Sequence, residues 1–336
     1  MYRFIKIIGF LIVSVILLSC SETTGYKKKL NVDCKNLEPQ RVEVLEYNKA
    51  LFAIDTDNFE EGLQTIRPRF QALLGDTLYA VDIMRFKEFV TDSFTIKINE
   101  LAEQAFPNTA FVAEKAKGVY QHLKYYYPNI SIPTTYTYIS GINQNSGPVM
   151  IGEEGVLISL DFYLSNNDLV YDKVGIPRYI SRRYQPASLT RDLAEAIYYA
   201  YFDKSFKAKN VLMEMVDRGK KYYFIEAMDP TLGDSEILGY SPEQTAWIHE
   251  NEGEVWASIV GNNMLYANGF EQYKVLFNDG PFTAGFSEDA PARLGDFFGL
   301  QIVRSFMTNN DVSLQELMEM TDYQDVFQQS QYKPRK

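Results

Sequence analysis

The first twenty residues decide which part of the chain is free to fold. In MYRFIKIIGFLIVSVILLSC, Arg3 and Lys6 form a short positive segment, and residues 7–18 form an apolar one. The apolar run is shorter than the roughly 20 residues that a membrane-spanning helix needs. It is typical of a signal peptide. We therefore predict that residues 1–19 are removed and take no part in the fold.

The end of this segment, LLSC, predicts a lipid anchor. It resembles the bacterial lipobox, in which the cysteine is acylated and becomes the first residue of the mature protein. We predict that Cys20 is lipidated and that the lipid holds the protein to a membrane. The alternative is an uncleaved anchor that ends in a chance cysteine. It leaves unexplained why charge, apolar run, small residue and cysteine follow in this order.

The charge of the mature chain excludes one class of partner. Removal of residues 1–19 takes away two of the 33 basic residues and none of the 44 acidic ones, so the net charge becomes 31 − 44 = −13. Affinity for nucleic acid comes from Lys and Arg side chains that neutralise phosphates, so we expect no nucleic-acid partner. Cys34 has no possible intramolecular partner once Cys20 is acylated. We predict an inert thiol there rather than an intermolecular cross-link.

Composition along the chain predicts one folded domain. Residues 21–38 are polar and charged, and together with Cys20 we assign residues 20–38 to a lipidated tether. The remainder shows no internal repeat and no Pro/Ser-rich linker. With 46% hydrophobic residues in the chain, it can bury a large core. We assign residues 39–336 to a single globular domain.

The hydrophobic period predicts an α+β fold, mostly helical with a small central sheet. Between residues 134 and 164, TTYTYIS, PVMIG and GVLISLDFYL are β-branched or aromatic and predict three strands, and RVEVLEY predicts an earlier one. Over the other long segments, apolar residues recur every three or four residues, which is the spacing of an amphipathic helix. Helices are predicted over residues 57–74 (with a possible kink at Pro68), 81–90, 96–106, 111–128, 189–202, 210–217, 242–263, 291–307 and 314–320.

Two local patterns predict details of helix structure. Ser241, Pro242 and Gln244 match a capping box with proline at the first helical position. Gly295 and Gly299 lie one turn apart on one helix face. Each glycine costs about 1 kcal/mol of helix propensity relative to alanine. A close approach of another backbone, for which only glycine leaves room, would explain this cost, so we predict one at this face.

The helix LTRDLAEAIYYAYF follows the predicted strands and carries the first candidate site. Asp192 and Glu195 are three apart and share a face, and Arg191 can pair with Glu195 four residues later. Buried carboxylates of this kind can act in general acid–base catalysis, because burial raises one pKa toward neutrality. The simpler interpretation is a solvated face with one ion pair, and the sequence alone favours it.

Other chemical motifs are absent from the sequence. The two histidines, His122 and His249, lie far apart and in no metal-binding spacing. His249 is three residues before Glu252, which is typical of an exposed pair. We therefore predict no metal, no cofactor and no catalytic residue. The segment WIHENEGEVW contains both tryptophans, Trp247 and Trp256. It either binds a ligand or presents one wet and one core face of a helix.

Several stretches in order resemble one family. HLKYYYP, LISLDFYL, PRYI, GKKYYFIEAMDP, GYSPEQTAWIHENEGEVW, GPFTAGF, APARLGDFFGLQIVRSFM and QSQYKPRK together cover most of residues 120–336. They resemble the gliding-motility lipoprotein B family of Bacteroidetes. The family is known for gliding and for the associated type IX protein-secretion machinery, although members also occur in relatives that do not glide. The resemblance implies a non-enzymatic lipoprotein whose partners are the lipid membrane, through acylated Cys20, and envelope motility or secretion proteins.

The resemblance also implies an architecture and a location. The family is similar to predicted zincin-type zinc peptidases, whose His-Glu-x-x-His helix follows a small sheet. By order along the chain, those positions fall on Arg191, Asp192 and Glu195, which implies a zincin-like architecture without its zinc ligands. The acid-rich stretch that resembles surface-export signals in these bacteria is missing after Cys20, which favours the periplasmic face of the outer membrane.

Two further functions stay open at this point. One is a hydrolase that uses Asp192 and Glu195, with Glu226 or His249 contributing. The other is a cell-wall or glycan-binding module that uses the aromatic surface.

Overall fold

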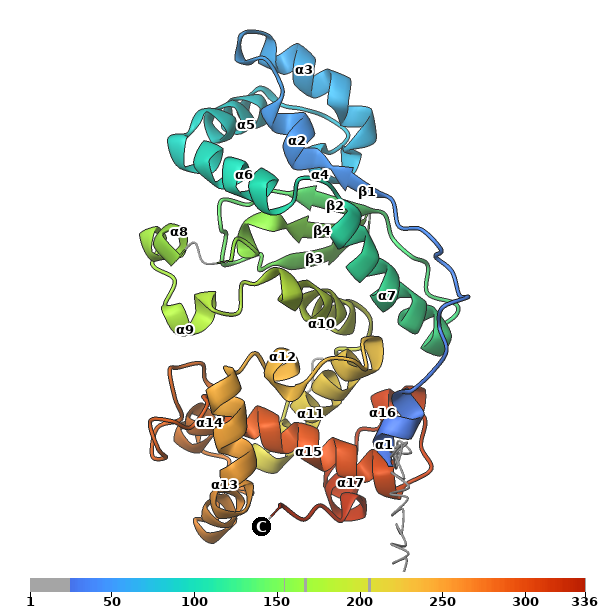
Figure 1. Ribbon diagram of the computed structural model, residues 1–336, viewed down its shortest axis with the longest axis vertical. Coiled ribbons are helices and arrows are strands. Elements are labelled where there is room, and N and C mark those ends of the chain that lie inside the picture. The colour runs from blue at the N-terminus through green and yellow to red at the C-terminus, as the bar shows by residue number, and fades with distance from the viewer. Residues whose placement is uncertain (1–24, 154, 166–167, 205–206, 336) are drawn as a thin grey trace, which may run out of the picture.

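A small sheet lies between two layers of helices (Figure 1). The computed structural model describes residues 25–153, 155–165, 168–204 and 207–335. Its sheet contains β1 (Val44–Glu46), β2 (Thr135–Tyr138), β3 (Val149–Gly152) and β4 (Gly155–Ser159), in the order β1-β2-β4-β3. The first three strands in that order are parallel, and β3 runs antiparallel to β4. The predicted α+β fold, mostly helical with a small sheet, is confirmed.

Alternation along the strands gives the sheet two buried faces. Leu45, Tyr136 and Tyr138 belong to a core shared with the N-terminal helices. Val156 and Ile158 belong to the larger core on the opposite side. Successive side chains of a strand point to opposite faces, so these short apolar strands hold both helical layers in place.

The N-terminal layer consists of short helices. They are α2 (Tyr47–Phe52), η1 (Thr56–Asn58), α3 (Phe59–Ile66), η2 (Arg67–Arg69), α4 (Gln71–Leu74), α5 (Ala80–Thr91) and α6 (Ser93–Ala105). The single helix predicted over residues 57–74 is wrong. Its path breaks around Pro68, which lacks the backbone N–H that a continuing helix requires.

The layer on the other side of the sheet contains the helix singled out in the sequence. Its members are α7 (Ala110–Tyr126), η3 (Leu160–Phe162), α8 (Asp168–Lys173), α9 (Arg178–Ser181), η4 (Pro186–Ser188) and α10 (Leu189–Tyr201). The helix predicted over residues 189–202 is confirmed to within one residue. Below this layer in Figure 1 lies a helical body made by the rest of the chain.

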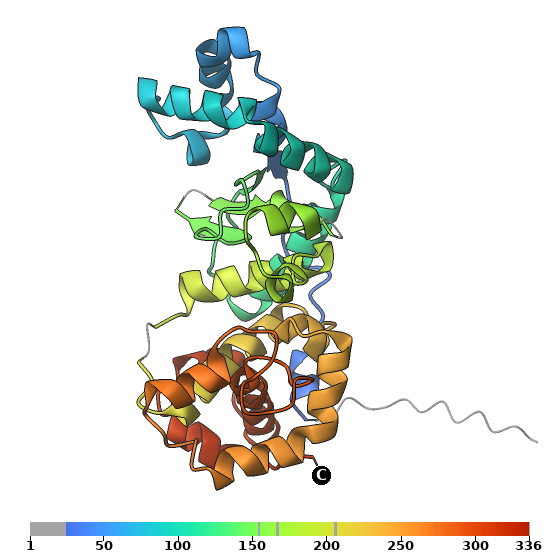
Figure 2. The ribbon, with the colours of Figure 1, turned by 90° about the vertical axis from the view of Figure 1, so that its left-hand side faces the viewer.

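The C-terminal body is built around two long helices, α11 and α15 (Figure 2). Its helices are α11 (Val211–Met228), α12 (Asp234–Leu238), α13 (Pro242–Gly261), α14 (Phe270–Phe277), α15 (Leu294–Asn309), α16 (Leu314–Glu319) and α17 (Tyr323–Ser330). A methyl group on Gly299 would lie 1.9 Å from the carbonyl oxygen of Met215, so the predicted close backbone approach is confirmed there. At Gly295 the close neighbour is the ring of Phe277 instead.

The predicted start of α13 is confirmed in detail. The Ser241 hydroxyl accepts a hydrogen bond from the backbone N–H of Gln244 (3.1 Å), and the backbone N–H of Ser241 donates to Gln244 Oε1 (3.3 Å). The start of the next long helix differs from the prediction. α15 begins at Leu294 rather than Pro291, because Arg293 before it has a left-handed backbone with φ 60°.

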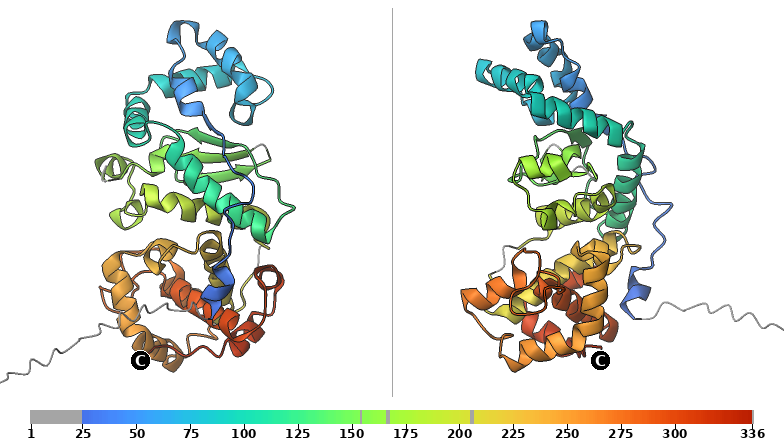
Figure 3. Two further views of the ribbon diagram at one scale, coloured as in Figure 1. Left: turned by 45° about the vertical axis from the view of Figure 1, so that its right-hand side comes forward. Right: turned by 60° about the vertical axis from the view of Figure 1, so that its left-hand side comes forward.

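The segment before β1 is folded against the C-terminal body. Here α1 (Tyr26–Leu30) packs on α15: the Tyr26 N–H donates to Thr308 Oγ1 (3.1 Å), and Lys29 Nζ donates to the carbonyl oxygen of Asn310 (2.6 Å). Residues after α1 then run along α7 to reach β1 (Figure 3). Residues 25–38, which we expected to belong to a tether, are therefore part of the packed structure.

Two side chains anchor this N-terminal segment. Leu30 and Cys34 are both buried, and Gln121 of α7 donates from Nε2 to the carbonyl oxygen of Leu37 (2.8 Å). Burial raises the pKa of the Cys34 thiol to about 11, with a smaller contribution from Asp33. Because the thiolate is the reactive form, this thiol is suited to packing. Among the described residues, no helix is both long and apolar enough to cross a membrane.

Candidate functional site

The charged side chains of α10 are buried. Arg191 is 9% exposed and Asp192 is 5% exposed, whereas the solvated face favoured by the sequence would leave them in water. That interpretation is wrong, because α10 is covered by α7 and by α11 of the C-terminal body. Charged groups in this setting need partners.

Asp192 is held by two neighbours. Arg191 donates from Nε and Nη2 to Asp192 Oδ1 (2.8 and 2.6 Å), and Tyr163 Oη donates to Oδ2 (3.0 Å). Burial raises the pKa of Asp192, although the charge of Arg191 opposes this. Both oxygens of the carboxylate are thus occupied by protein donors.

Glu195 pairs with α11 rather than with its own helix. Lys221 Nζ donates to Glu195 Oε1 (2.6 Å) and to Tyr199 Oη (3.2 Å). The predicted ion pair between Arg191 and Glu195 is therefore wrong, because Arg191 pairs with Asp192 and Glu195 pairs with Lys221. Burial acts to raise the pKa of Glu195, but the charge and hydrogen bond of Lys221 outweigh it and hold that pKa below its usual range.

Arg191, Glu195 and Lys221 line a cavity of about 290 Å³, which we call the arginine cavity. Its basic side chains come from five places in the sequence: Arg183, Arg191, Arg218, Lys221 and Arg293. Its carboxylates are Glu195, Asp279 and Asp296. Asp192 is not among the lining residues described. Each basic side chain has a carboxylate partner, so the walls are a network of ion pairs.

Asp296 forms the centre of that network. Tyr222 Oη donates to its Oδ2 (2.7 Å), and Arg218 Nη1 and Arg293 Nη1 each lie 3.2 Å from a carboxylate oxygen. Asp296 is 0% exposed. Arg293 is held in its left-handed conformation by these bonds and by donation from Nη2 to the carbonyl oxygen of Leu238 (2.6 Å). Such strain persists only where the surroundings over-determine it.

Glu226 and His249, the other two candidates, lie in a second network. Arg304 donates from Nε to Glu226 Oε2 (2.8 Å) and from Nη1 to Asp234 Oδ1 (2.7 Å). His249 Nε2 lies 3.0 Å from Asp234 Oδ2. The expected exposed pair of His249 with Glu252 is wrong. Glu252 is buried, and His249 turns to α12 instead.

The second network also joins the N-terminal helix to the body. The guanidinium of Arg304 lies 5.2 Å from the centre of the Tyr26 ring, a cation–π contact. Burial acts to raise the pKa of Asp234, but the His249 hydrogen bond and the charge of Arg304 outweigh it and hold the pKa well below its usual range. Glu226 and His249 therefore act here as structural partners.

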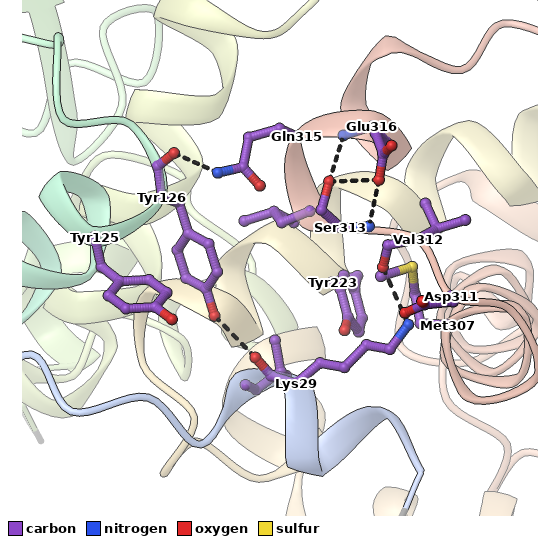
Figure 4. A pocket seen from close by; sticks show the side chains of 12 residues that line it. Lys29, Tyr125, Tyr126, Tyr223, Met307, Asp311, Val312, Ser313, Gln315 and Glu316 are labelled. Carbon is purple, nitrogen blue, oxygen red and sulfur yellow. Dashed lines mark hydrogen bonds between the residues drawn. The ribbon is translucent and has the colours of Figure 1, made fainter.

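A second cavity, of about 700 Å³, lies where α1, the end of α7 and α16 meet (Figure 4). Lys29, Tyr125, Tyr126 and Tyr223 line it together with residues 311–316 (Figure 4). Lys29 is occupied by backbone carbonyl groups. The buried Tyr223 hydroxyl has no hydrogen-bond partner among the described residues.

The remaining candidates are structural by position. Trp256 packs against Phe298 and Tyr332, each with ring centres 5.2 Å apart, and Trp247 packs against the same core. His122 Nδ1 lies 2.9 Å from the carbonyl oxygen of Gly118 within α7. Over the part of the chain that the structure describes, no three His, Cys, Asp or Glu side chains are placed to hold a metal ion. Cys20 lies outside the described residues.

Sequence reasoning missed the basic residues that organise both networks. Arg183, Lys221 and Arg304 meet their partners only through the tertiary fold, whereas Arg218 also pairs with Glu214 and Arg293 with Asp296 within one turn of the chain. One local signal was present: Lys221 lies in GKKYYFIEAM and Arg304 in LQIVRSFM, each a charge within an apolar helical run. A charge at such a position needs a buried counter-charge.

Comparison with known proteins identifies the family. A family model described as gliding motility protein GldB matches residues 27–334, which is most of the chain. No curated protein and no solved structure matches the chain. The likeness to zincins therefore stays a prediction. The chain belongs to the GldB family of gliding-motility-associated lipoproteins.

Proposed function

We propose that this protein is a non-enzymatic component of the gliding-motility machinery, or of the linked secretion machinery, and that it acts by binding a protein partner. The observation that carries the proposal is the state of the Asp192 carboxylate. At the position where a zincin-like enzyme needs a free side chain, both oxygens accept hydrogen bonds from Arg191 and Tyr163. A general base must reach the proton it abstracts.

The other candidate residues support the same conclusion. Glu195 is engaged by Lys221, Glu226 by Arg304, and His249 by Asp234. A catalytic role for Glu226 or His249 would have to displace its partner, and Lys221 holds the pKa of Glu195 below its usual range, which makes that carboxylate a weak base. Displacement leaves a buried charge unpaired, which costs several kcal/mol.

The proposal includes a lipid anchor at the outer membrane. It rests on the LLSC sequence at Cys20 and on the lipoprotein family. Replacement of Cys20 by alanine tests the anchor. We expect the variant to escape labelling by a fatty-acid probe and to leave the outer-membrane fraction. Normal labelling of this variant would show that the anchor is elsewhere.

The central experiment is purification of the full-length lipoprotein from cross-linked cell envelopes, followed by mass spectrometry. We expect motility or type IX secretion proteins to co-purify. Photo-reactive amino acids at Tyr79, beside α5, and at Tyr266, in the C-terminal body, place probes on opposite ends of the molecule. Their side chains are 65% and 60% exposed. The end that yields the cross-link is the partner-binding end.

The outcomes distinguish binding from catalysis. Recovery of no envelope protein from either probe, together with a stoichiometric metal that resists dialysis and with hydrolysis of peptides, contradicts the proposal and favours the hydrolase alternative. A sample without irradiation is the matched control. Binding to isolated cell wall that survives in the absence of any protein partner favours the glycan-binding alternative instead.

A further inference from the structure

The arginine cavity contains polar atoms that the protein leaves unused. Arg191 uses Nε and Nη2 for Asp192, and its Nη1 donates to no described residue. Arg183 uses Nη2 for Asp279 (2.5 Å), and its Nε is buried without a partner. Two arginines thus keep free donors in one small space.

These two arginines lie side by side at Gly239. A methyl group on Gly239 would lie 3.0 Å from Arg191 Nη1 and 3.1 Å from Arg183 Cδ. Gly239 has φ +65°, a conformation that glycine adopts freely. The glycine therefore leaves room for both side chains at once. Two adjacent guanidinium groups with free N–H donors form a site for a carboxylate.

Two carboxylates of the same cavity also keep a free oxygen. Glu195 accepts from Lys221 through Oε1 only, and Asp279 meets Arg183 and Arg293 through Oδ1 only. No described residue donates to Glu195 Oε2 or to Asp279 Oδ2. Their side chains are 32% and 42% exposed, compared with 11% for Arg191 and 14% for Arg183. The carboxylates therefore lie toward the opening and the arginines lie deeper.

Charge decides which ligand fits. A simple anion would meet the arginines but would also lie near Glu195, Asp279 and Asp296, and a simple cation would meet the opposite difficulty. Like charges this close repel one another strongly where water is excluded. A molecule that carries both a carboxylate and an ammonium group satisfies both sets of free atoms.

We propose that the arginine cavity binds a small zwitterion of the α-amino acid class. Its carboxylate accepts hydrogen bonds from Arg191 and Arg183, and its ammonium group donates to Glu195 and Asp279. The cavity of about 290 Å³ has room for roughly ten water molecules at ~30 Å³ each, which is enough for an amino acid with a small or medium side chain. This site does not depend on the protein partner proposed above.

The test is calorimetric titration of the detergent-solubilised full-length lipoprotein. The probes are glycine, L-alanine and D-alanine, with acetate and ethylammonium as the two halves of the ligand. We expect an amino acid to bind at least tenfold more tightly than either half. If acetate or ethylammonium binds as tightly as the amino acids, the zwitterion assignment is wrong. If none of the probes binds, there is no ligand site here.

One variant separates the ammonium contact from the rest. Glu195→Gln keeps a carbonyl oxygen for Lys221 and removes the charge that the ammonium group needs. We expect the amino-acid affinity to fall about tenfold while the affinity for acetate does not fall. Glu254→Gln, an exposed position on α13, changes the net charge equally and should have no effect. Unchanged amino-acid affinity in Glu195→Gln contradicts the proposal. If that variant does not fold, the comparison of the intact protein with the half-ligands still decides.

Discussion

Replacement of Arg304 by methionine removes the cation on which two buried carboxylates depend. Arg304 is 7% exposed and pairs with Glu226 at 2.8 Å and with Asp234 at 2.7 Å. Removal of one partner of a buried ion pair costs about 3–5 kcal/mol, because the remaining charge is left without compensation. Loss of the Tyr26 cation–π contact adds about 0.5–2 kcal/mol. We expect the free energy of unfolding to fall by about 3.5–7 kcal/mol at pH 7.

A compensated variant separates the charge effect from lost packing. Combining Arg304→Met with Glu226→Gln and Asp234→Asn leaves no unpaired carboxylate in the network. Its free energy of unfolding should fall by less than half as much as that of Arg304→Met alone. The assay is urea unfolding of the detergent-solubilised protein, followed by tryptophan fluorescence, because Trp256 packs in the same body.

The pH dependence of the free energy of unfolding provides a second test of the Arg304→Met variant. In the intact protein, the depressed pKa of Asp234 contributes stability above the unfolded pKa near 3.9, and this stability is lost as pH falls. Without Arg304, both carboxylates take up protons more readily. The difference between the intact protein and Arg304→Met should therefore narrow from pH 7 to pH 4. A loss below 1 kcal/mol at pH 7, or a difference that widens in acid, would refute the structural role of this network.

Three further predictions concern single positions. Burial lowers the pKa of Lys220 to about 8, so the unfolded state binds more protons than the folded state between about pH 8 and 10. The free energy of unfolding, measured relative to Lys220→Met, should therefore rise over that pH range. A difference between the two proteins that stays constant with pH contradicts this prediction. Gly299→Ala places a methyl group 1.9 Å from the carbonyl oxygen of Met215. It should lower the free energy of unfolding by at least about 1–3 kcal/mol in thermal or urea unfolding. A gain in stability would show that α11 and α15 can move apart at no cost. Ser241→Ala removes the hydroxyl that accepts from Gln244 and should cost about 1 kcal/mol, measured against Ser241→Thr, which keeps the cap.

Local patterns predicted much of the fold. The capping box at Ser241 and the close approach at Gly299 both followed from neighbouring residues, and the structure confirms them. The central strands were predicted from β-branched and aromatic runs. The break near Pro68 was foreseen only as a kink, because the apolar spacing continues through residues 57–74 while the backbone does not.

The candidate site was harder to predict because its partners are distant in sequence. Lys221 is 26 residues from Glu195, and Arg304 is 78 residues from Glu226. Periodicity placed Arg191 and Glu195 on one helix and suggested that they pair. It carried no information on which other helix would cover them. Tertiary packing decides the burial of α10 and the pairing of Glu195 with Lys221 and of Arg183 with Asp279.

The docking of α1 on α15 has a consequence for the order of folding. Tyr26 and Thr308 are 282 residues apart, so the first described helix of the chain packs against one of the last. Closing a loop of this length costs only about 0.6 kcal/mol more than closing one half as long, but contacts between such distant residues form late. In a chain that is synthesised from the N-terminus, Tyr26 and Leu30 therefore stay without these contacts until α15 has been synthesised. We expect the segment next to the predicted lipid to become ordered in the last step of folding, so that truncation before α15 leaves an anchored chain whose first helix has no surface on which to pack.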